Sequence, residues 1–105
     1  MSDMIKIRRE SIRWDILLTL NNSRPNGIFE RVVLSVVQAS YPDATQKELR
    51  CELDYLKTRN LIRVKKQPDG RWCCELDRYG IDVVEYTVDV EPGIARPEKY
   101  FNADA

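Results

Sequence analysis

The residue types that catalysis and metal binding require are scarce in this chain of 105 residues. Histidine, the commonest general base and metal ligand, is absent. The three cysteines, Cys51, Cys73 and Cys74, show no CxxC spacing, and neighbours on a strand would point to opposite faces. A thiol metal sensor needs two or three thiolates that converge on one ion. No glycine-rich phosphate loop or nucleophile–histidine pair is visible either. We therefore expect no enzyme, no metal site and no cofactor.

Basic and hydrogen-bonding side chains instead gather in two segments, and their chemistry suits a polyanion such as double-stranded DNA. The first segment is residues 45–57, whose basic side chains are Lys47, Arg50 and Lys57. The second contains Arg63, Lys65, Lys66 and Arg71, which surround a single Asp69. A third basic cluster, Arg8, Arg9 and Arg13, is expected to be a solvated helix face rather than a contact surface.

The formal net charge is zero, with 17 basic and 17 acidic residues, but the charges are unevenly distributed. Residues 1–74 hold 14 Lys and Arg against 9 Asp and Glu, whereas residues 75–105 hold 3 against 8. With 43% hydrophobic and 32% charged residues, the composition is that of an ordinary globular domain. No stretch is apolar enough to span a bilayer, and residues 1–4 lack the basic-then-apolar order of a signal peptide. The expectation is a cytoplasmic protein that binds no membrane.

Apolar spacing predicts three helices in the first half of the chain. The first runs to about Leu20, where two asparagines and then a proline should stop it. The second covers residues 28–39, because an i, i+3, i+4, i+7, i+8 pattern outweighs the strand propensity of its valines. The third begins at Thr45, which forms a capping box with Glu48, and ends at Asn60, which can adopt the left-handed conformation.

A hairpin follows the third helix. Strands at 61–66 and 71–76 flank a turn at 67–70, in which proline pre-sets φ and glycine supplies a positive φ. The basic tip either follows a phosphate backbone or protects an exposed sheet edge from pairing. Only one of Trp72 and Cys73 should face inward, so Trp72 is either part of the core or an exposed contact residue.

The remaining chain divides into a short helix and an acidic end. Asp77 can cap a short helix after the hairpin. Residues 87–90 alternate like a strand, and residues 92–105 have the composition of an extended tail. We therefore expect a domain at 1–86, followed by a strand-like segment and acidic tail at 87–105.

Three helices followed by a two-stranded hairpin is the element order of a winged helix-turn-helix. Residues 48–62 resemble the recognition helix and exit of bacterial winged-helix regulators, with Asn60 where their Gly-Leu-Ile signature has glycine. Residues 76–80, Leu-Asp-Arg-Tyr-Gly, resemble the Leu-Thr-x-x-Gly that follows the wing in those families. The resemblance covers residues 5–86. The ending, residues 90–97, is similar to that of small winged-helix proteins of Mu-like prophages.

The predicted fold class is therefore α+β, a winged helix-turn-helix with three helices, a two-stranded wing, a short post-wing helix and an extended C-terminal tail. The resemblance implies a small DNA-binding protein, a bacterial or prophage transcription regulator or accessory factor. The resemblance also implies that the third helix enters the major groove and that the wing contacts the phosphate backbone. The DNA-contact residues that it implies are Thr45, Gln46, Lys47, Arg50 and Lys57 on the helix and Arg63, Lys65, Lys66 and Arg71 on the wing.

The alternative is a protein-interaction module of a phage or nucleoprotein assembly that does not touch DNA. The four basic and three acidic residues of 47–59 leave this alternative open. The acidic C-terminal segment could mask the basic face of its own chain, form the arm of a homodimer or bind a protein partner.

Overall fold

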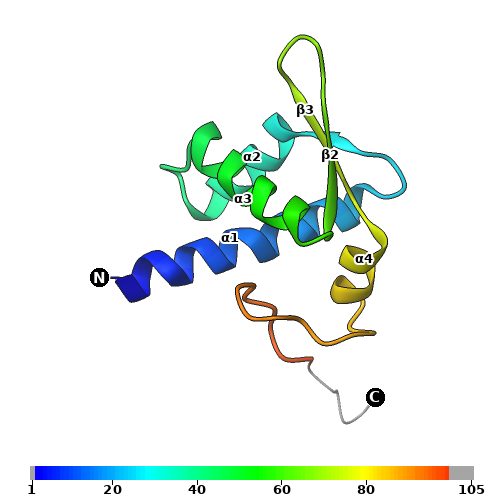
Figure 1. Ribbon diagram of the computed structural model, residues 1–105. Helices are drawn as coiled ribbons and strands as arrows, with labels where there is room; N and C mark the ends of the chain where they lie inside the picture. Colours follow the sequence, from blue (N-terminus) through cyan, green and yellow to red (C-terminus); the bar gives the residue numbers. More distant parts are fainter. Residues whose placement is uncertain (1, 100–105) are drawn as a thin grey trace.

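The computed structural model describes residues 2–99 and has an α+β fold. This part of the chain contains four helices and one three-stranded antiparallel sheet with the strand order β1-β3-β2. Figure 1 shows α1, α2 and α3 packed together, with the β2–β3 hairpin projecting from them and the C-terminal segment on the opposite side. In chain order the elements are α1 (Ser2–Ser23), β1 (Ile28–Phe29), α2 (Glu30–Ser40), α3 (Gln46–Thr58), β2 (Ile62–Lys66), β3 (Trp72–Leu76) and α4 (Arg78–Val84).

The first helix is longer than the sequence pattern predicts. It continues past Leu20 through both asparagines and ends at Ser23. Each asparagine costs less than about 1 kcal/mol in helix propensity, which is too little to end a helix by itself. The helix ends two residues before Pro25, because a proline disfavours helical geometry in the residue that precedes it.

The second helix starts at Glu30 and not at residue 28, because β1 occupies the two preceding residues. β1 pairs with β3 and supplies a third strand that the predicted two-stranded hairpin lacked. Two residues are too few to show an alternating pattern. The predicted apolar stripe is half correct: Val33 and Val37 are buried, whereas Val32 and Val36 are each 44% exposed.

The third helix agrees closely with the sequence prediction. The Thr45 hydroxyl oxygen accepts a hydrogen bond from the Glu48 backbone N–H at 3.1 Å. The Glu48 carboxylate does not complete the capping box, since it accepts hydrogen bonds from Arg8 instead. Asn60 has a φ of 64° and so ends the helix in the left-handed conformation. The inward side chains of α3 are Leu49, Leu53 and Leu56, each at most 1% exposed.

The hairpin of β2 and β3 also forms as predicted, with Lys66 opposite Trp72. Gly70 in the turn has a φ of 93°. Cys74 is fully buried, so the side chains that share its face of β3 lie on the core side of the sheet. Trp72, two residues earlier, is on this side, and its partly buried side chain packs against the core. Cys73 lies on the other face.

The chain after the hairpin differs from the prediction in one respect. Asp77 caps α4, because its carboxylate accepts from the Arg78 N–H at 2.8 Å. Residues 87–90, however, form no strand. A residue with positive φ, Tyr86 at 61°, redirects the chain directly after α4, and no sheet edge receives the segment.

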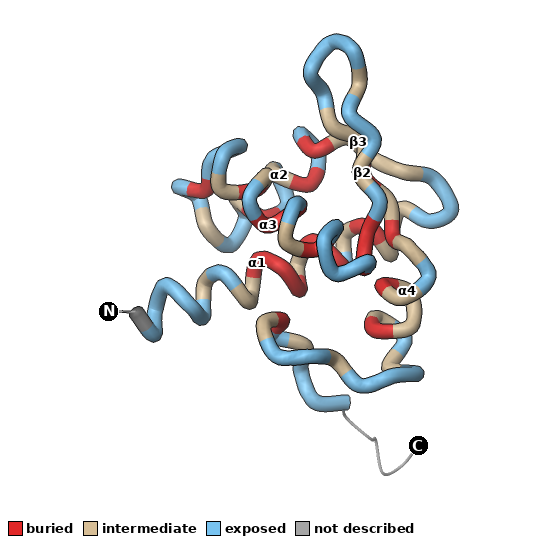
Figure 2. Tube along the Cα trace, viewed as in Figure 1, coloured by how far each residue is buried: buried red, intermediate tan, exposed pale blue. Residues whose placement is uncertain are grey.

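The C-terminal segment returns across the body of the protein and does not extend away from it. Ile94 is 9% exposed and belongs to the core, and the Ala95 N–H donates to the Glu10 carbonyl at 3.2 Å. Residues 87–99 therefore pack onto the 1–86 unit. The sequence also offers Tyr100 and Phe101 as apolar contact residues of this segment, but both lie outside the described residues. Figure 2 shows the buried residues concentrated where the helices and the base of the sheet meet, while much of the hairpin is exposed.

None of the helices within residues 2–99 has the length and apolar character needed to cross a bilayer.

Candidate nucleic-acid interface

The outer face of α3 is the first part of the candidate interface. The helical spacing predicts Lys47, Cys51, Asp54 and Thr58 at the centre of this face, and all four are exposed, as is Lys57 beside them. Neither lysine has an ion-pair partner within residues 2–99. Their ammonium groups are thus available to an external anion.

Two of the acidic residues of α3 are neutralised by α1. Glu48 accepts from Arg8 through both carboxylate oxygens, at 2.8 Å each, and Arg8 also bonds to Asp43 at 3.0 Å. These hydrogen bonds, above all the one to Glu48, raise the pKa of the Arg8 guanidinium. Glu52 is buried and accepts from Arg13 Nε at 2.7 Å. The acidic side chain that α3 still exposes is Asp54.

The expectation of a solvated arginine face on α1 holds for Arg9, which is exposed, but is wrong for Arg8 and for Arg13, which forms an ion pair with Glu52. Both side chains are 9% exposed. The Arg13 guanidinium also donates to the Gly93 carbonyl at 2.9 Å and lies 3.4 Å from the centre of the Tyr55 ring. A Cβ on Gly93 would lie 2.2 Å from the Tyr55 hydroxyl oxygen, so this close approach requires glycine. Arg13 therefore joins α1, α3 and the C-terminal segment.

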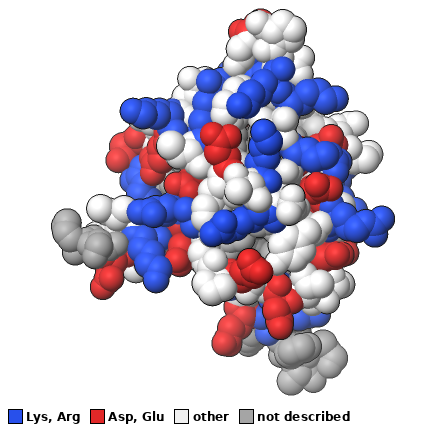
Figure 3. Space-filling model, viewed as in Figure 1, with Lys and Arg blue, Asp and Glu red and all other residues white. Residues whose placement is uncertain are grey.

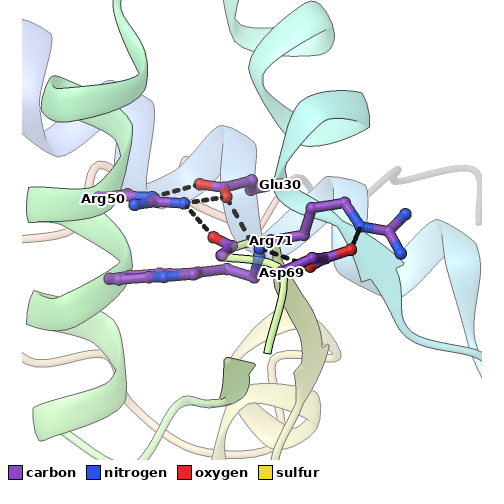
Figure 4. Close-up of polar contacts among 6 residues, drawn as sticks. Glu30, Arg50, Asp69 and Arg71 are labelled. Carbon is purple, nitrogen blue, oxygen red and sulfur yellow. Dashed lines mark hydrogen bonds and ion pairs between the residues drawn. The ribbon is translucent and has the colours of Figure 1, made fainter. Parts of the chain in front are cut away.

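Arg50, a predicted DNA contact, is largely engaged within the protein. Its Nε and Nη2 atoms donate to the two carboxylate oxygens of Glu30, and Nη2 also donates to the Gly70 carbonyl at 2.8 Å. Its guanidinium lies 4.5 Å from the centre of the Trp72 ring (Figure 4). The hydrogen bonds to Glu30 raise the pKa of Arg50. Arg50 thus fastens the hairpin to α2 and α3.

Glu30 is the residue of this site that the sequence analysis missed as a partner. It is 4% exposed, and its Oε2 also accepts from the Trp72 N–H at 3.1 Å. By its position in the sequence, Glu30 fits the first turn of a helix, where a carboxylate is favourable without any tertiary partner. No local pattern shows that this carboxylate is buried and must therefore be paired.

The hairpin is the second part of the candidate interface. Lys65 is exposed and has no ion-pair partner among the described residues. The Lys66 ammonium lies 4.5 Å from the centre of the Trp72 ring. Arg63 pairs with Asp77 at 2.7 Å and with Glu75 at 3.4 Å. Two of the four predicted wing cations, Lys65 and Lys66, therefore have no carboxylate partner within residues 2–99.

Arg71, the fourth predicted wing cation, pairs with Asp69 at 2.7 Å across the turn. The backbone N–H of Arg71 also donates to Asp69, and this bond lowers the pKa of the Asp69 carboxyl. The Arg71 guanidinium covers the ring of Phe29 at 4.2 Å from its centre.

A groove of about 710 Å³ brings predicted contact residues of α3 and the hairpin together. Lys57 lines one part of it and Arg63 and Lys65 another, with Asn60 and Cys73 among the other lining residues. A smaller cavity of about 230 Å³, nearer the start of α3, is lined by Gln46 and Arg71. Thr45, whose hydroxyl caps α3, lines neither of these two hollows.

The surface view agrees with this distribution of charge. In Figure 3, basic side chains gather over the hairpin stem and the front of the helical body, with acidic side chains interspersed. Toward the C-terminal segment the acidic side chains become more frequent. Residues 92–99 lie away from the hairpin (Figure 1), whose Lys65 and Lys66 are exposed.

The cysteines do not converge in the part of the chain that the structure covers. Cys51 is exposed, Cys73 is half-buried and Cys74 is buried. No group of three or more Cys, Asp or Glu side chains within residues 2–99 is placed to hold a metal ion. Burial raises the pKa of the Cys74 thiol to about 12, so this thiol is protonated and inert near neutral pH.

A scan against protein-family models finds no family that matches the chain, and searches of curated proteins and of solved structures find no match. Function is therefore inferred from the chain's own geometry.

Proposed function

We propose that this protein is a winged-helix DNA-binding protein, with α3 as its recognition helix and the β2–β3 hairpin as its wing. Three helices lead into the hairpin, and the short connection between α2 and α3 is that of a helix-turn-helix. The role proposed is that of a small transcription regulator or accessory factor.

The observation that carries this proposal is the sorting of charge on α3. Glu48 and Glu52 turn toward arginines of α1, whereas Lys47 and Lys57 point outward without a carboxylate partner among the described residues. The sequence alone shows a nearly balanced helix, but its outer face is basic except for Asp54. A phosphate backbone favours such a face because each contact releases condensed counterions.

The proposed roles follow from which groups remain available. Gln46 lies in the first turn of α3, where a recognition helix approaches base edges. Lys57 and Lys65 line the groove, and together with the exposed Lys47 and Lys66 they would bind phosphates. Arg50 acts as a positioning residue, because its bonds to Glu30 and Gly70 set the angle between hairpin and helix.

The test is fluorescence anisotropy with a labelled mixed-sequence duplex at about 50 and about 200 mM salt. Four phosphate contacts, from Lys47, Lys57, Lys65 and Lys66, give a slope of about −3.6 in log K against log salt. Affinity should then fall about 150-fold over this range. Binding that is insensitive to salt would contradict a phosphate-dominated interface.

A charge-matched pair of variants localises the contacts. Lys57→Gln/Lys65→Gln should halve the salt slope to about −1.8, because two of four phosphate contacts are lost. Lys6→Gln/Arg78→Gln removes the same charge from exposed positions outside the interface and should leave the slope unchanged. Equal effects of the two variants would refute the assignment of α3 and the hairpin.

The second candidate function is a protein-interaction module in a nucleoprotein assembly. It is favoured by the exposed Asp54 and Cys51 at the centre of the α3 face and by the zero net charge. Absence of duplex binding at about 50 mM salt, together with capture of a protein partner that Asp54→Lys abolishes, would select it.

A further inference from the structure

The cavity of about 230 Å³ at the start of α3 has a largely apolar lining. It lies where the starts of α2 and α3 meet the turn of the hairpin, and its apolar side chains are Phe29, Leu34 and Leu49. Leu49 is buried in the core, whereas Phe29 and Leu34 are only partly buried. The cavity therefore keeps apolar surface of these two side chains available for contact with a ligand.

The volume of this cavity sets the size of the ligand that it can hold. A cavity of about 150 Å³ with an apolar lining binds one benzene molecule. At about 230 Å³, this cavity has room for one ring of that size with a single small polar substituent. Arg31, Gln46 and Arg71 also line it and are exposed, so its mouth is at the protein surface.

Two of the charged lining residues are already neutralised within the protein. Both carboxylate oxygens of Glu30 accept hydrogen bonds from Arg50. The Arg71 guanidinium is paired with Asp69 at 2.7 Å, and in Figure 4 it extends away from the pair of Glu30 and Arg50. Neither Glu30 nor Arg71 therefore needs a charged ligand.

Arg31 is the charged lining residue that remains. It has no ion-pair partner within residues 2–99. The Gln46 side chain adds an exposed amide that can donate a hydrogen bond at the same mouth. A ligand with one negative charge complements this lining, whereas a cation would leave the charge of Arg31 unpaired and be repelled by it.

We propose that this cavity binds a small monoanion with an apolar body, of the size and chemistry of benzoate. The ring packs against Phe29 and Leu34, and the carboxylate pairs with the Arg31 guanidinium at the mouth. The planar guanidinium suits this role because it can donate two parallel hydrogen bonds to one carboxylate. A compact anion such as acetate binds more weakly, because it has no apolar body that removes Phe29 and Leu34 from water.

Three probe molecules separate the two parts of the proposed recognition. Benzoate carries both the ring and the charge, acetate carries only the charge, and benzyl alcohol carries only the ring. Titrations of the isotope-labelled protein, followed by amide NMR shifts and without nucleic acid, measure each affinity. For a ligand of this size we expect a Kd for benzoate on the order of 1 mM. Acetate and benzyl alcohol should each bind at least about fivefold more weakly.

The amides that shift locate the site. Saturable shifts with benzoate are expected at the lining residues Phe29, Leu34 and Gln46. The proposal is overturned if benzoate shifts none of these amides up to about 20 mM. It is also overturned if acetate or benzyl alcohol binds as tightly as benzoate. Because no nucleic acid is present, these outcomes are independent of the proposed function.

A charge-matched pair of variants tests the role of Arg31. Arg31→Gln should weaken benzoate binding about fivefold and leave the affinity for benzyl alcohol unchanged, because only the charged probe loses a partner. Arg9→Gln removes the same charge from an exposed position of α1 outside the cavity and should bind benzoate like the unmodified chain. Equal affinities of the two variants for benzoate would refute the assignment of Arg31.

Discussion

The buried ion pair between Arg13 and Glu52 offers the sharpest test of how α3 is held in place. Glu52→Leu removes the carboxylate but leaves the Arg13 guanidinium in a site where both side chains are only 9% exposed. The bond from Arg13 to the Gly93 carbonyl at 2.9 Å and the Tyr55 ring at 3.4 Å remain, but neither carries a compensating negative charge.

Removing one partner of a buried ion pair costs about 3–5 kcal/mol, because the other charge stays desolvated. The polar Gly93 contact places the expected loss for Glu52→Leu near the lower end of this range. For a domain of about 100 residues, each kcal/mol shifts Tm by roughly 4–8 °C, so Tm should fall by at least about 12 °C. Arg13→Met/Glu52→Leu replaces both charges with apolar groups and should lose less than the single variant.

Urea unfolding followed by circular dichroism measures these differences in the free energy of unfolding. Glu85→Leu is the matched control, because its ion pair with Arg24 is at the surface, with side chains 51% and 40% exposed. Surface pairs contribute about 0–1 kcal/mol. If Glu52→Leu costs no more than Glu85→Leu, or if the double variant is worse than Glu52→Leu, the account of α3 anchoring is wrong.

Three further predictions concern the turn after α3, the buried thiol and the C-terminal segment. Asn60→Val should destabilise the fold by about 1–2 kcal/mol in urea unfolding, whereas Asn60→Gly should not, because only the former strains a left-handed residue. Cys51 should react with a thiol reagent at pH 8 while Cys74 reacts only on unfolding. Because the pKa of Cys74 is raised from 9.0 to about 12 by burial, its stabilising contribution is complete below pH 9 and is lost as pH rises toward 12. Cys74→Ala should flatten this alkaline loss of stability. Removal of residues 92–105 should destabilise the fold by at least about 1.5–3 kcal/mol through loss of Ile94; an unchanged Tm with tighter duplex binding would support a masking tail instead.

The sequence by itself determined the elements whose signals are local. The Thr45 cap, the leucines of α3 and the left-handed Asn60 act within one or two turns of helix, and the turn at Gly70 acts within four residues. Each therefore leaves a pattern that can be recognised without any knowledge of distant residues. The candidate contact residues on α3 and the hairpin could be named for the same reason.

Tertiary structure alone decided which of these charges are neutralised by partners elsewhere in the chain. Arg8 and Arg13 lie about 40 positions from their partners on α3, and Arg50 lies 20 positions from Glu30. Such pairings leave no periodic pattern of residue types in the sequence, because they depend on how the helices pack and not on local conformation. The same holds for the two residues of β1, which become a strand only because β3 offers them a free edge. Local chemistry thus specified the helices and the turn, while the long-range packing of α1 on α3 converted a balanced helix into one with a basic outer face.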